Sequence, residues 1–152
     1  MKGLVYVAAF APKEGQSIGN FFDFSKGVSA GLLIKDEGGF LYIDPNKFHD
    51  LFAQDVDPVQ TDIMAAVQKP INSSIFADKS GPPAWEQLPT WYQVSENDKA
   101  IPPDTQRMFA KQMNATTISF PASHASYVSH PNEVAKLILD AANSISNSTS
   151  NK

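Results

Sequence analysis

Two side chains in the last third of the sequence could form an acid–base pair. Asp98 lies in a polar loop after a short apolar segment at residues 91–94, and His124 lies in the loop after a β-branched segment at residues 116–120. If both segments are parallel strands, these loops leave the carboxyl ends where α/β sheets bind ligands. Asp98 could then hold one tautomer of the imidazole while Nε2 takes a proton from a nucleophile. The same loops also fit a non-catalytic role, in which Asp98 only caps a helix beginning at Pro102.

Other residues are candidates for the acid or for the base of such a pair. Glu96 is a second candidate acid, less favoured because it lies closer to the end of the preceding segment. His130 is a second candidate base, although its position directly before Pro131 also suits the start of a helix. His49 falls on a predicted helix away from both loops, where a histidine is more often a surface residue than a catalyst.

The predicted elements place both loops in an α/β fold. Residues 4–10 are apolar throughout, which is typical of a strand covered on both faces of a parallel sheet. Apolar residues at helical spacing predict helices at residues 45–53 and 58–69, and from Pro102 and Pro131 onward. The order of strand, long insert, strand, helix, strand and helix predicts about three parallel strands with flanking helices.

A single domain is expected over residues 1–142. Residues 11–89 form its insert, which we expect to be an α-helical lid with long loops. Residues 143–152 are mostly Ser, Asn and Thr, a composition that predicts a flexible tail.

Composition excludes several classes of function. The 152 residues carry a net charge of -4 and a pI of about 5.2, so neither nucleic acid nor an anionic membrane is an expected partner. The chain has no cysteine, no cluster with metal-ligand spacing and no phosphate-binding loop, so no metal or cofactor is expected. The first apolar run has only the length of a strand, and no run approaches the ~20 residues of a membrane helix, which favours a cytoplasmic location.

Three runs of the sequence are similar to a known family: LVYVAAFAPKEGQS, TWYQVSENDKAIPPDTQRMFAKQM and SFPASHASYVSHPNEVAKLILDAA. Together they resemble the C-terminal half of bacterial α/β-hydrolases of the esterase type, with a more distant similarity to plant methylesterases and hydroxynitrile lyases. The intervening region, from LYIDPNKFHDLFAQDV to SGPPAWEQLPT, resembles the cap of those proteins. The resemblance implies that Asp98 matches the acid, and His124 the base, of a catalytic triad that hydrolyses a small ester.

The nucleophile of that triad has no clear counterpart here. In the family, the G-x-S-x-G elbow and the oxyanion-hole donors come before the strand that here begins at Leu4. Residues 27–31, GVSAG, fit the motif, and Ser29, Asp98 and His124 follow the family's order. However, polar residues interrupt the lead-in FFDFSK and a short segment stopped by glycine follows, so Ser29 is a weak candidate nucleophile and more typical of a loop.

We therefore expect the C-terminal portion of a hydrolase, with little or no esterase activity unless a nucleophile-bearing half is present. A second hypothesis is a non-catalytic binding or assembly module. In that case the exposed edge of the strand at residues 4–10 pairs with a missing N-terminal half or with a second copy of the chain.

Overall fold

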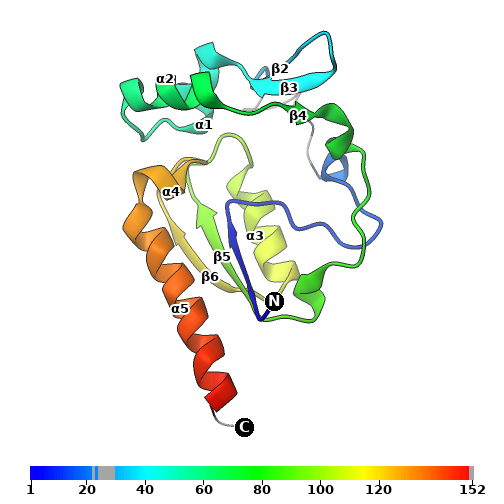
Figure 1. Cartoon of the computed structure of the whole chain (residues 1–152), viewed down its shortest axis with the longest axis vertical. Coiled ribbons are helices and arrows are strands. Elements are labelled where there is room, and N and C mark those ends of the chain that lie inside the picture. The colour runs from blue at the N-terminus through cyan, green and yellow to red at the C-terminus, as the bar shows by residue number, and fades with distance from the viewer. Residues whose placement is uncertain (22, 24–29, 151–152) are drawn as a thin grey trace.

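A three-layer α/β arrangement organises the chain in the computed structural model, which describes residues 1–21, 23 and 30–150 (Figure 1). Within these residues the main sheet is parallel, in the order β1 (Leu4–Val7), β5 (Thr90–Ser95), β6 (Thr116–Phe120). Val5 is in register with Trp91, and Trp91 with Thr116. The expected α/β fold with about three parallel strands and flanking helices is confirmed.

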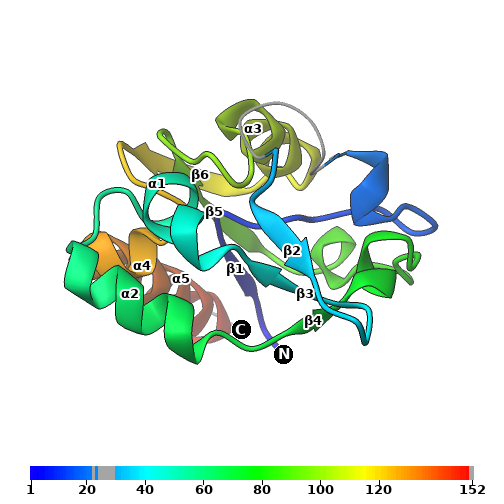
Figure 2. The same ribbon diagram turned by 90° about the horizontal axis from the view of Figure 1, so that it is seen from above.

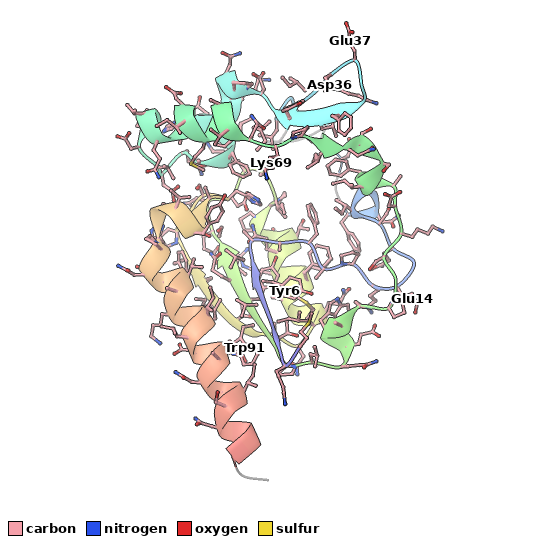
Figure 3. The ribbon with its side chains drawn as sticks, viewed as in Figure 1. Tyr6, Glu14, Asp36, Glu37, Lys69 and Trp91 are labelled. Carbon is pink, nitrogen blue, oxygen red and sulfur yellow. The ribbon has the colours of Figure 1, made fainter. Side chains whose placement is uncertain are left out.

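Helices cover both faces of this sheet, with α3 (Pro103–Gln112) on one side and α5 (Pro131–Ser150) on the other (Figure 2). Successive residues of β5 point to opposite faces. Tyr92 packs in a cluster with Phe109 of α3, whereas Trp91 points toward α5 and packs against Leu137 (Figure 3). All six residues of β5 are buried, as expected of a central strand. The loop that follows β5 is therefore anchored on the most enclosed strand of the sheet.

The segment between β1 and β5 folds over the carboxyl ends of the strands (Figure 1). It contains helices α1 (Phe48–Phe52) and α2 (Pro58–Val67) and an antiparallel sheet of β2 (Leu33–Lys35), β3 (Phe40–Ile43) and β4 (Ile71–Asn72). The insert thus carries helices, as expected, together with a small antiparallel sheet that was not expected. The Asp36 carboxylate accepts from the Phe40 amide at 2.8 Å, and Gly39 turns the chain at a φ of 85°, so the DEGG sequence closes a hairpin. Asp36 and Glu37 lie at its outer tip (Figure 3).

Strand β1 is shorter than the expected residues 4–10. It ends at Val7 because Ala8 adopts a left-handed φ of 44°, while its amide still donates to the Gln93 carbonyl at 3.0 Å. The Tyr92 hydroxyl accepts from the Ala9 amide at 3.0 Å and donates to the Ala9 carbonyl. Burial raises the pKa of Tyr92 above its ordinary value, which keeps this hydroxyl a donor. The turn after β1 is therefore fixed to the central strand.

Helix α5 continues through Ser150, where a flexible tail was expected from residue 143. Its apolar face explains the difference, because Ile145 packs against the cluster of Trp91, Leu137 and Ala141. The Ser146 hydroxyl also donates to the Ala142 carbonyl at 3.0 Å. None of the described helices has both the length and the apolar character needed to cross a membrane.

A substitution at Gly3 tests how closely this last part of α5 packs on the sheet. A Cβ at position 3 would lie 2.7 Å from Cδ1 of Ile145 and 3.0 Å from Cζ3 of Trp91. Gly3→Ala is expected to lower the free energy of unfolding by about 1–2 kcal/mol, measured by urea denaturation, because the contact must be relieved by moving packed side chains. Gly81→Ala is the control, since a Cβ there meets nothing within 4 Å. Equal effects of the two variants would show that α5 does not pack here as described.

Candidate active site

Asp98 and His124 meet at the carboxyl ends of two adjacent strands. Asp98 follows β5, His124 follows β6, and these strands are parallel neighbours. Nδ1 of His124 lies 2.7 Å from Oδ2 of Asp98. Because a carboxylate only accepts hydrogen bonds, the contact places a proton on Nδ1 and leaves Nε2 of the neutral ring as the acceptor. The structure thus brings together the two residues singled out in the sequence, and their catalytic role stays a prediction.

The Asp98 side chain is fully buried, and both of its oxygens have donors. Oδ1 accepts from the amides of Ala100 at 2.7 Å and Ile101 at 2.8 Å. Oδ2 accepts from Nε2 of Gln106 at 2.7 Å, in addition to the imidazole. A buried carboxylate needs this degree of pairing. Asp98 therefore holds the turn before α3 and also orients the imidazole. It does not cap α3, because the helix begins after Pro102 without a side-chain cap hydrogen bond.

Gln106 is a site residue that the sequence analysis missed. Its side chain is fully buried, donating to Asp98 and to the Ile101 carbonyl at 2.8 Å and accepting from the Ser95 amide at 2.9 Å. It thereby joins the end of β5 to the carboxylate. The available signal was a polar residue on the buried face of α3, three positions before Phe109.

The imidazole of His124 stands at the edge of an apolar cavity. Its side chain is 20% exposed, and the ring centroid of Phe52 lies 4.7 Å from its own. Among the described residues, Asp98 is the ring's one hydrogen-bond partner, so Nε2 is left available to a substrate or a nucleophile. The cavity has a volume of about 230 Å³, and His124 contributes the polar side chain to an otherwise apolar lining of described residues that includes Phe10, Leu32, Ile43, Phe52, Phe76 and Ile101.

The other candidate residues lie elsewhere or have different partners. Glu96 forms an ion pair with Arg107 of α3. Nδ1 of His130 lies 2.9 Å from the Ser129 hydroxyl, and His49 contacts Asp50 at an exposed position. Ser29 lies outside the described residues. In the part of the chain that the structure describes, no group of three or more His, Asp or Glu side chains is arranged to hold a metal ion.

Comparison with known proteins gives one family and one fold. A model described as the alpha/beta hydrolase family matches residues 1–137. The alpha/beta hydrolase nvfD of Aspergillus novofumigatus (strain IBT 16806) is 26% identical over 143 residues, which cover 91% of this chain and 56% of that protein. The solved pyrethroid hydrolase PytH is 26% identical with a TM-score of 0.71, over 93% of this chain and 60% of that one.

More distant solved structures share the fold. Polyneuridine aldehyde esterase has a TM-score of 0.74 at 18% identity, over 93% of this chain and 62% of that one. The methylesterase MES16 from Arabidopsis has a TM-score of 0.74 at 13% identity, over 94% of this chain and 59% of that one. The chain therefore spans between 56% and 62% of the length of these four proteins.

Proposed function

The chain belongs to the alpha/beta hydrolase family, and we propose that it supplies the acid and the base of a serine esterase. The observation that carries the proposal is the 2.7 Å contact between Asp98 and His124 at the carboxyl ends of adjacent strands. Similarity to proteins named as a pyrethroid hydrolase, polyneuridine aldehyde esterase and a methylesterase supports an ester as the substrate. The nucleophile and the oxyanion-hole donors would come from a polypeptide segment outside this chain.

In the proposed reaction, Nε2 of His124 removes the hydroxyl proton of the serine as its oxygen attacks the ester carbonyl carbon. Asp98 stabilises the imidazolium that results. Nε2 then gives the proton to the leaving alcohol as the carbon–oxygen ester bond breaks, which leaves an acyl-enzyme. Water repeats the two proton transfers, releasing the acid and restoring the serine.

The apolar cavity beside His124 supports a hydrophobic substrate. Its described lining carries no charged side chain apart from a protonatable imidazole, so a charged group bound there would lose its hydration without a partner. A volume of about 230 Å³ suits one small apolar moiety of an ester. The segment over residues 11–89 would act as the cap that closes this cavity.

The proposal predicts that the chain alone does not turn over p-nitrophenyl acetate above the rate of its own His124→Ala variant. Acid and base without a nucleophile or oxyanion hole lack most of the transition-state stabilisation. A longer form translated from coding sequence upstream of Met1, where that sequence encodes a G-x-S-x-G elbow, should show turnover in the same assay. Turnover by the chain alone that disappears in Ser29→Ala would instead make Ser29 the nucleophile.

A second candidate function is an assembly module. Strand β1 lies at the edge of the main sheet, and its four residues are only half-buried. Unpaired backbone groups at such an edge can accept another strand, from an N-terminal half or from a second copy. Light scattering that shows a strict monomer with an ordered sheet would count against this function.

A further inference from the structure

The loop that carries His124 is attached to the cap on both sides of the histidine. The amide of Ser123 donates to Oδ2 of Asp55 at 2.8 Å, and the amide of Ala125 donates to the carbonyl of Phe52 at 3.2 Å. Both acceptors lie within a few residues of each other, in the segment from the end of α1 to the start of α2. These amides belong to the two residues that flank the imidazole in the chain.

From this geometry we infer that Asp55 is a positioning residue, which holds the imidazole of His124 in place through the backbone of its loop. The inference rests on the proposed function of His124 as a base. It assigns the cap a second role besides enclosing the cavity. With these contacts in place, the base is held for proton transfer. Without them, the Ser123 amide would lose its acceptor, and the Ala125 amide would keep only the Ser123 hydroxyl, from which it lies 3.1 Å.

The surroundings of the Asp55 carboxylate suit this role. Oδ2 also accepts from the Ser129 hydroxyl at 2.9 Å, and Nδ1 of His130 lies 3.8 Å away. Burial raises the pKa of Asp55, but hydrogen bonds from Ser123 and Ser129 outweigh it and lower the pKa below its ordinary value. The ionised carboxylate therefore connects the residue before His124 to the end of α4 (Ser126–Ser129).

The rest of the loop is anchored to the sheet instead. The Ser126 hydroxyl donates to Oε1 of Gln93 at 2.9 Å, and both side chains are buried. Residues 123–125 are instead held mainly by the contacts of their amides with Asp55 and Phe52 of the cap. Since a small displacement of a catalytic group costs much of its effect, these two contacts would govern how well His124 is placed.

Amide hydrogen exchange, followed by NMR on the whole chain, tests the inference in Asp55→Ala. The amides of Ser123 and Ala125 should exchange at least about tenfold faster than in the unmodified chain, relative to β5 amides such as Tyr92. Asp57→Ala is the matched control, because the Asp57 carboxylate accepts from the first amides of α2, that of Val59 at 3.0 Å among them. Asp55→Asn should restore most of the protection, because its side-chain oxygen can still accept from Ser123.

Unchanged exchange at Ser123 and Ala125 in Asp55→Ala, or an equal increase in Asp57→Ala, would overturn the inference. If Asp55→Ala does not fold, Asp55→Glu gives the same comparison, since it keeps the charge but displaces the acceptor. The NMR signal of the His124 ring N–H, recorded in the same samples, tests the proposed function separately from the role of Asp55. If the amides of residues 123 and 125 are protected but Nδ1 of His124 carries no proton, the acid–base pair is refuted. The role of Asp55 in holding the loop would still stand.

Discussion

Replacing His124 by alanine is expected to lower kcat for p-nitrophenyl acetate by at least about 10⁴-fold in a longer form of the chain that carries a nucleophile. The physical reason is the position of Nε2, which borders the apolar cavity and has no hydrogen-bond partner among the described residues. Without it, no group takes the serine proton during attack or returns it to the leaving alcohol. Initial rates under saturating substrate measure the effect, and KM should change little because the loss falls on the chemical step.

His130→Ala is the matched control for this prediction. Its ring contacts the Ser129 hydroxyl and lies 5.2 Å from the Phe120 ring, so it should alter kcat only a few-fold. His124 is not the base if His124→Ala keeps more than about a tenth of the activity. The same conclusion follows if His130→Ala loses as much activity as His124→Ala.

The second large effect is expected for Asp98→Asn, with kcat lowered about 10⁴-fold while the fold is retained. The side-chain oxygen of the asparagine would stay toward the amides of Ala100 and Ile101, which need an acceptor. Its NH₂ group would then face Nδ1 of His124 and donate to it, which forces the proton onto Nε2. The side-chain amide of Gln106 would lose its acceptor at position 98 but keep the Ile101 carbonyl. An imidazole in that tautomer cannot accept the serine proton. The same assay measures the loss.

Asp104→Asn serves as the control for Asp98→Asn. Asp104 begins α3 nearby, but its side chain is exposed and pairs with Arg107 at 2.8 Å. An exposed ion pair contributes little to stability or to a distant site, so a change of less than a few-fold is expected. Full activity in Asp98→Asn, with the protein folded, would show that Asp98 only holds the turn before α3.

The main sheet and the candidate pair could be predicted because their signals are local. Residues 4–10, 91–94 and 116–120 are compact apolar or β-branched runs, and prolines mark the starts of the helices that follow the last two. Once the strand order was inferred, the rule that loops at carboxyl ends converge placed Asp98 beside His124. Local pattern and topology pointed to these two loops, and the resemblance to the hydrolase family singled out Asp98 and His124 within them.

The remaining features depend on contacts that sequence spacing does not encode. Asp55 reaches Ser123 across 68 residues, and nothing in the sequence around either one indicates a partner. The hairpin of β2 and β3 left a signal in its DEGG turn, but its strands are too short to show alternation. The composition after residue 143 indicated disorder, and the packing of Ile145 on the sheet overrode it.

The position of the proton on the His124 ring, measured in the chain as it stands, decides whether Asp98 orients the imidazole as an acid–base pair requires. Nitrogen-15 NMR of the ring reports which nitrogen carries the proton, with His124→Ala to assign the signal among the three histidines. We expect a proton on Nδ1 that is protected from exchange, and its transfer to Nε2 in Asp98→Asn. A ring protonated mainly on Nε2 in the unmodified chain, or one that Asp98→Asn leaves unchanged, would contradict this expectation.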